Sequence, residues 1–203
     1  MNRLMTATFA TVLLCLCFYA QGQASAQATN QAPSPAPAAA RPAPAPLAIP
    51  NPHYVSIAME IDVDRPAPEV WKRVGKFCDI GEWFQIPCTI LSGTDGEFGV
   101  VRSIGDEVLV GKTELSYTYT QPVRVGQPYI LYHGTLEARP VTATTSKLVY
   151  TLVFDNSTLA DDAARDADIA RRRTLFMNGL KNMKILAEGG TLPSRPAPAP
   201  GPR

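Results

Sequence analysis

The stretch Ile-Asp-Val-Asp-Arg-Pro-Ala-Pro-Glu-Val-Trp at residues 61–71 marks a change of hydrophobic period. Before it, from Val55 to Asp64, apolar and polar residues alternate, which is the two-residue period of a half-buried strand. Pro66 and Pro68 then suit the first turn of a helix, where a missing N–H group costs nothing. Apolar residues continue at helical spacing as far as Phe77. The stretch therefore predicts a strand followed directly by an amphipathic helix.

Beyond this helix the chain returns to the strand period. Gly81 interrupts the helical pattern, so residues 79–84 are expected to form one more short turn. Clusters of Gly, Pro and polar residues then divide the chain into an antiparallel meander. The expected strands are 89–92, 100–104, 107–120, 129–139 and 145–155. Tyr132 shares its parity with Leu136 on one face, whereas His133 is assigned to the outer face.

A long helix is predicted over residues 159–188. Acids gather at its start and lysines near its end, as the helix dipole favours, and Thr158 and Asp161 have capping-box-like spacing. Its apolar stripe is interrupted at Arg172 and Arg173. The stripe consists of Ile169, Phe176, Leu180, Met183 and Ala187. We interpret the run 171–173 as a solvated face paired with Asp166 and Asp168; docking on an acidic partner is the alternative.

The two ends of the chain differ in composition from the middle. Residues 1–26 resemble a cleavable signal peptide, with Arg3, an apolar run over 6–20 and Ala24-Ser25-Ala26 before the cut. An uncleaved anchor is the alternative, although a spanning helix needs about 20 apolar residues. Residues 27–50 and 189–203 are rich in Ala and Pro, typical of disordered linkers. We expect a bacterial periplasmic or secreted protein with no stable membrane insertion after cleavage, and one folded domain over 51–188.

Charge and cysteine content narrow the partners. With 19 basic and 18 acidic residues the chain is almost neutral, so nucleic acid is not an expected partner. Cys15 and Cys17 leave with the signal peptide, and an exported chain would oxidise Cys78 and Cys88 to a disulfide. Two buried thiols are the alternative. Neither histidine lies at ligand spacing from this pair, so no metal site and no cofactor are predicted.

The segment 61–71 resembles the first strand and the "alanine-proline, acid, valine-tryptophan" helix start of the START-like, or SRPBCC, superfamily, which includes the polyketide cyclase/dehydrase-like proteins. Residues 74–77 followed by Trp83 resemble its next segment, and 96–102 its glycine turn into a strand that begins valine-arginine. The resemblance covers about residues 54–188. It implies an α+β helix-grip fold, a curved antiparallel sheet wrapped around the long C-terminal helix. It also implies an internal pocket for lipids, sterols or polyketides, although a solid core would satisfy the residue pattern equally well.

Aromatic and polar side chains on the inward face are the candidate ligand-binding residues. Tyrosines offer apolar area together with a hydroxyl, which suits an oxygen-bearing apolar ligand. Gly134 and Gly179 are expected to leave space beside them. The candidates are Trp83, which is placed near the mouth, Arg102, Glu114, Tyr117, Tyr119, Tyr132, Tyr150 and Phe176. Alternatively they are core aromatics, and Arg102 and Glu114 form an ordinary cross-strand pair.

No catalytic residue is assigned, because the chain has no Gly-x-Ser-x-Gly elbow and few histidines. Three functions remain. The first is binding or carrying an apolar small molecule. The second is a cyclase, dehydratase or isomerase that acts on such a ligand, and the third is a ligand-free envelope interaction or stress module.

Overall fold

The computed structural model describes residues 51–124, 126–127 and 129–194. The predicted signal peptide, the first linker and most of the predicted tail lie outside the described residues. Among the described helices, none is long and apolar enough to span a bilayer.

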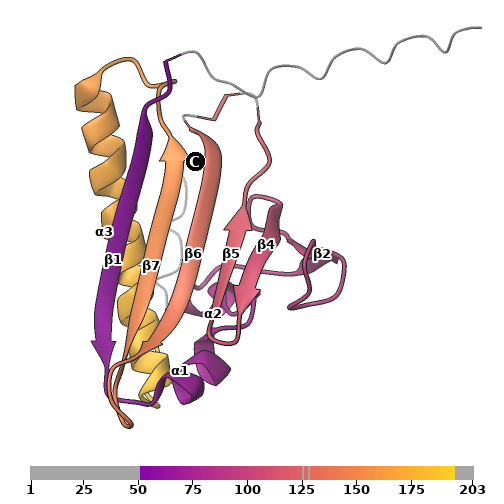
Figure 1. Cartoon of the computed structure of the whole chain (residues 1–203), viewed down its shortest axis with the longest axis vertical. Coiled ribbons are helices and arrows are strands. Elements are labelled where there is room, and N and C mark those ends of the chain that lie inside the picture. The colour runs from indigo at the N-terminus through magenta and orange to yellow at the C-terminus, as the bar shows by residue number, and fades with distance from the viewer. Residues whose placement is uncertain (1–50, 125, 128, 195–203) are drawn as a thin grey trace, which may run out of the picture. The chain divides into compact units, whose positions relative to one another are not determined.

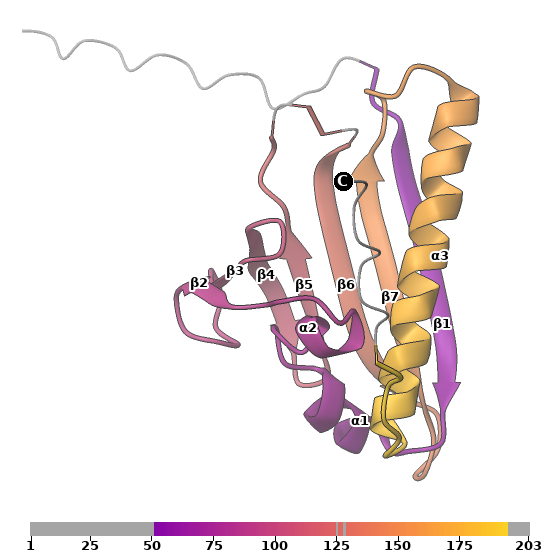
Figure 2. The same ribbon diagram turned by 180° about the vertical axis from the view of Figure 1, so that it is seen from behind.

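Seven strands form one antiparallel sheet in the order β1-β7-β6-β5-β4-β3-β2. The strands are β1 (Tyr54–Val63), β2 (Ile90–Ser92), β3 (Val101–Arg102), β4 (Glu107–Thr113), β5 (Ser116–Thr120), β6 (Ile130–Pro140) and β7 (Ser146–Asp155). The helices are α1 (Ala67–Val74), α2 (Ile80–Trp83) and α3 (Asp162–Ala187). All three helices lie on the same face of the curved sheet, with α3 running along β1 and β7 (Figures 1 and 2). This is the predicted α+β helix-grip arrangement.

The alternation read from the sequence places the core between the sheet and α3. In β1 the residues Val55, Ile57 and Met59 are buried, and the side chains between them are exposed. The register of β1 on β7 sets Met59 opposite Tyr150. Apolar side chains of both strands therefore face the helix together.

The predicted single strand over 107–120 is wrong, because this segment is a hairpin made of β4 and β5. Its turn contains Glu114 and Leu115, and the Thr113 hydroxyl stabilises it by bonding Ser116 Oγ at 2.7 Å and accepting from the Leu115 amide. The Thr and the Ser that flank the turn provide local hydrogen bonds that compete with continued strand pairing. The reversal places Glu114 at the exposed tip of the hairpin.

Helix α3 has 26 residues, and its N-cap is Asp161, whose carboxylate accepts from the Ala164 amide at 2.8 Å. The predicted start near residue 159 was therefore early. Residues 159–161 come before the first helical turn, because Asp161 takes the capping position.

The predicted disulfide between Cys78 and Cys88 is present, with a Cα–Cα separation of 5.6 Å. It closes the loop that contains α2, immediately before β2. The bridge thus ties the chain before α2 to the chain before β2.

Candidate functional site

A cavity of about 350 Å³ lies between α3, the inner face of β5 and β6, and the segment that begins with α2. Its walls are mostly aromatic and aliphatic. They consist of Ile80, Phe84, Ile86, Ile104, Glu107, Tyr119, Gln121, Tyr129, Tyr132, Arg171, Arg172, Leu175 and Phe176. The walls come from segments far apart in the sequence, which the sheet and α3 bring together.

A chain of hydrogen bonds runs along the sheet side of this cavity. The Tyr129 hydroxyl donates to Gln121 Oε1 at 2.8 Å, and Gln121 Nε2 donates to Glu107 Oε1 at 2.7 Å. Glu107 Oε2 in turn accepts from Nε of Arg102 at 2.6 Å. Three cavity-lining side chains are thereby held in fixed positions by a buried arginine behind them.

Arg102 is fully buried, and the protein surrounds its guanidinium on several sides. Nη1 donates to the Phe77 carbonyl at 2.5 Å, and the guanidinium carbon lies 4.2 Å from the centroid of the Phe77 ring. Burial raises the pKa of the Glu107 carboxyl, and the charge of Arg102 and the Gln121 hydrogen bond act in the opposite direction. The pair is therefore a compensated buried charge beside the cavity.

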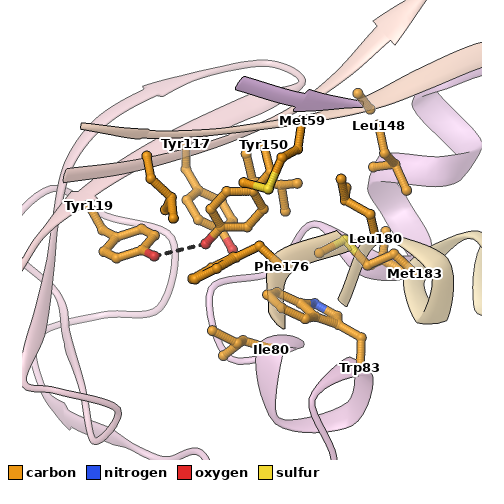
Figure 3. Packing of buried hydrophobic residues seen from close by; sticks show 14 of the residues in the cluster. Met59, Ile80, Trp83, Tyr117, Tyr119, Leu148, Tyr150, Phe176, Leu180 and Met183 are labelled. Carbon is orange, nitrogen blue, oxygen red and sulfur yellow. Dashed lines mark hydrogen bonds between the residues drawn. The ribbon is translucent and has the colours of Figure 1, made fainter. Parts of the chain in front are cut away.

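The inner tyrosines keep their protons. Burial raises the pKa of Tyr119, Tyr132 and Tyr150. The Tyr119 and Tyr150 hydroxyls bond each other at 2.8 Å (Figure 3). These side chains present neutral hydroxyl groups and ring surfaces to the interior.

On the helix side, Arg172 is buried, which corrects the expectation that residues 171–173 form a solvated face. Its Nε donates to Asp168 Oδ2 at 2.7 Å. Its guanidinium carbon lies 4.1 Å from the Tyr129 ring centroid and 4.5 Å from that of Phe154. Stacking on two rings and the bond to a carboxylate one turn away offset the cost of burying this charge. Hydropathy patterning does not reveal such contacts, because they come from other elements of the fold.

Of the residues predicted to bind a ligand, Tyr119, Tyr132 and Phe176 line the cavity. Trp83 and Tyr150 do not; they are fully buried behind it, and Trp83 is not at the mouth. The Tyr150 ring packs on Phe176 with centroids 4.7 Å apart (Figure 3). These rings therefore form the floor beneath the cavity.

The remaining three candidates lie elsewhere. Arg102 is behind the cavity wall, and Tyr117 borders a second cavity of about 250 Å³ near Trp71 and Lys112. Glu114 is exposed at the β4–β5 turn and contributes to neither cavity. The alternative, a cross-strand pair of Glu114 with Arg102, is wrong, because Arg102 pairs with Glu107.

Gly134 and Gly179 do not leave empty space, contrary to expectation. A Cβ on Gly134 would lie 2.4 Å from the Tyr119 ring, and one on Gly179 would lie 2.8 Å from Phe84. Each glycine lets an aromatic ring approach the backbone closely. The space that they provide is filled by side chains that then border the cavity.

Sequence reasoning missed Glu107, Gln121, Tyr129 and Arg172. The sequence contained one signal for Glu107, which is the Gly105-Asp106 pair just before it. In the structure both residues have positive φ, and the Glu107 amide donates to the Ile104 carbonyl at 3.2 Å. A Gly-Asp pair is typical of such a tight hairpin turn, and the turn sets Arg102 directly opposite Glu107. Nothing in the local sequence indicates the other three.

No family model matches this chain, and no curated protein matches it. Similar solved structures exist. A Thermobifida fusca protein is 22% identical, with a TM-score of 0.55, over 69% of this chain and 99% of that one. The Zhui aromatase/cyclase from Streptomyces sp. R1128 is 18% identical, with a TM-score of 0.53, over 68% of this chain and 100% of that one.

The di-domain ARO/CYC BexL from the BE-7585A biosynthetic pathway is 19% identical, with a TM-score of 0.51, over 66% of this chain and 46% of that one. These similarities agree with the observed strand order and with the position of α3. The chain therefore has the helix-grip fold that these solved structures share.

Proposed function

We propose that this protein binds a largely apolar, ring-containing small molecule in the cavity between α3 and strands β5 and β6. The observation that carries the proposal is the cavity itself. Its volume of about 350 Å³ falls within the roughly 300–1,000 Å³ that is usual for small-molecule sites. Its walls combine apolar surface with a few fixed polar groups, which is the composition of such sites.

The aromatic lining indicates which ligands fit. Tyr119, Tyr132 and Phe176 present rings to the cavity, and offset or edge-on stacking of a ligand ring on such surfaces is favourable. Gln121 and Tyr129 are held by the hydrogen-bond chain. Gln121 Nε2 keeps a second hydrogen for a ligand oxygen, and the Tyr129 hydroxyl, whose hydrogen goes to Gln121, can accept from a ligand hydroxyl. A flat polycyclic molecule with oxygen substituents therefore suits the cavity better than a flexible polar metabolite.

The test is saturable binding of a neutral apolar dye, N-phenyl-1-naphthylamine, to the full chain, followed by displacement with polycyclic phenols. Tyr132→Trp should weaken dye binding by about tenfold, because the larger ring occupies cavity volume. Tyr54→Trp is the matched control, since Tyr54 is 63% exposed at the start of β1. Failure of the folded wild-type chain to bind any of these compounds would exclude the proposal and leave the ligand-free interaction module.

A second candidate, a cyclase, dehydratase or isomerase, is favoured by one observation. Glu107 lines the cavity, and burial raises the pKa of its carboxyl, as is common for residues that transfer protons. If the bound compound is converted, Glu107→Gln should lower turnover at least a hundredfold, roughly the contribution of one general acid or base, while binding persists. Binding without turnover in the wild type would eliminate this candidate.

A further inference from the structure

Two arginines of α3 share a single carboxylate at the wall of the cavity. Arg171 Nη2 donates to Asp168 Oδ1 at 2.6 Å, and Arg172 Nε donates to Asp168 Oδ2 at 2.7 Å. A bidentate pair would use both oxygens of the acid for one guanidinium. Because Arg171 bonds Oδ1, Arg172 makes one hydrogen bond to Asp168, to Oδ2, where a bidentate pair would make two.

A second donor nitrogen of Arg172, Nη2, has no hydrogen-bond partner among the described residues. This nitrogen is itself buried. The side chain is only 5% exposed, and rings cover the guanidinium. A buried charged donor without an acceptor is costly, so an acceptor that enters the cavity would be bound favourably.

The charges around the cavity do not balance. The lining residues with formal charges are Glu107, Arg171 and Arg172, and their direct partners are Arg102 and Asp168. These residues contribute three guanidinium groups and two carboxylates, so their net charge is +1. Glu107 is already paired with Arg102, so the surplus lies on the α3 side.

Position along α3 indicates where an anionic group would sit. Arg171 has a side chain that is 61% exposed, and Leu175, one turn further, is 46% exposed. Arg172 itself is 5% exposed, which makes it as buried as Tyr132 and Phe176 at 3% and 7%. A charged group bound by Arg172 would therefore lie inside the cavity, next to the more exposed Arg171 on the helix, and an attached ring system would contact the neighbouring rings.

Building on the proposed function, we infer that the ligand is an organic monoanion, with a carboxylate or enolate oxygen bound by Arg172 and a ring system held against Tyr119, Tyr132 and Phe176. This assigns Arg172 as a specificity-determining residue of the cavity. It also narrows the ligand from apolar compounds in general to ring compounds with one acidic oxygen group.

The test compares 2-naphthoate with its neutral methyl ester by calorimetry on the full chain at neutral pH. The acid should bind about tenfold more tightly, which is the lower range for a hydrogen bond to a charged group. In Arg172→Met the affinity for 2-naphthoate should fall to that for its methyl ester. Arg173→Met is the matched control, because it removes the same charge from the next residue of the same helix, which is exposed. This variant should keep the preference for the acid.

The outcomes separate this inference from the proposed function. If the ester binds as tightly as the acid to the wild-type chain, the monoanion inference is wrong and the apolar cavity stands. If neither compound binds, both are wrong. If Arg173→Met loses the preference as completely as Arg172→Met, the effect is long-range charge attraction and the role of Arg172 is refuted. The wild-type comparison decides the ligand class even if Arg172→Met does not fold.

Discussion

Arg102 shows how one buried charge depends on its partner. It is fully buried, and Glu107 is the acid that compensates it. We expect Arg102→Met to cost about 3–5 kcal/mol of unfolding free energy at neutral pH, because Glu107 would remain as a buried charge without its partner. Urea denaturation of the wild type and the variant measures this difference.

The same variant should also change the pH dependence of stability. Burial already raises the pKa of Glu107 above 4.5 against the opposing effect of Arg102, so removing Arg102 raises it further. The folded variant then binds this proton more readily than the unfolded chain, and its stability falls as pH rises from 4.5 through the raised pKa. The penalty of Arg102→Met should therefore be smaller in mildly acidic buffer than at neutral pH.

An exposed pair provides the control for this prediction. Arg139 bonds Glu137, with side chains 51% and 34% exposed, and Arg139→Met should cost less than about 1 kcal/mol with no comparable pH effect. Equal penalties for Arg102→Met and Arg139→Met would contradict the compensating role of the buried pair.

Gly134 controls the position of a cavity wall. In Gly134→Ala the new methyl group would lie 2.4 Å from Tyr119, so the ring must move and its hydroxyl bond to Tyr150 must lengthen or break. We expect a loss of about 1–3 kcal/mol in stability and weaker dye binding. Gly111→Ala is the control, because its nearest contact is Thr118 Cβ at 3.3 Å. Unchanged dye affinity in a folded Gly134→Ala protein would mean that Tyr119 does not shape the cavity.

At the scale of elements, the sequence predicted the strands and helices that have a clear hydrophobic period. It did not predict the hairpin turn at Glu114 or the burial of Arg172. β1 and α1 were predictable because their alternation and their proline-rich junction are local signals. The β4–β5 hairpin was missed because strand parity is ambiguous around Glu114, and the turn depends on the Thr113 hydroxyl. Arg172 was misjudged because its burial depends on rings of β6 and β7 that are distant in sequence.

The loop that contains α2 is an element whose position depends on the disulfide. The loop supplies Ile80, Phe84 and Ile86 to the cavity, and Cys78–Cys88 closes it. We expect the double variant Cys78→Ser/Cys88→Ser to lose about 3 kcal/mol of stability, from the entropy of a loop of this length, and to bind the dye more weakly. Urea denaturation and dye titration measure the two effects.

Reduction of the wild type without denaturant should reproduce both effects, because it opens the same loop without changing the side chains. If the double variant is as stable as the oxidised wild type and binds the dye equally well, the bridge does not position this wall.

At the scale of the whole molecule, the fold was predictable and most of the cavity was not. The order of strands and helices follows from successive local periods, and the resemblance of residues 54–188 to a known superfamily supplied their helix-grip arrangement. The cavity wall combines residues from α2, β4, β5, β6 and α3 with neighbouring loops, and their side-chain contacts depend on the completed tertiary structure. For this reason only three of the eight predicted ligand-binding residues line it.

We propose that the whole chain is exported and cleaved near Gln27, which follows from the apolar run over 6–20 and the small residues before the cut. The Cys78–Cys88 bridge supports this proposal, because such bonds persist mainly in oxidising compartments. Expressed from its full gene in a bacterium, the mature protein should begin near Gln27 and contain no free thiol. N-terminal sequencing and thiol titration of the unfolded, unreduced protein check both expectations.

Blocking export should change both readouts together. Leu13→Arg places a charge in the apolar run and should retain the precursor in the cytoplasm, uncleaved and with all 4 cysteines reduced. Ala39→Arg adds the same charge in the Ala/Pro-rich segment and should be exported, cleaved and oxidised like the wild type. A wild-type chain that keeps Met1 in the membrane fraction would instead indicate an uncleaved anchor. Full-length soluble protein in the cytoplasm with its disulfide formed would contradict both export and the argument from the oxidising compartment.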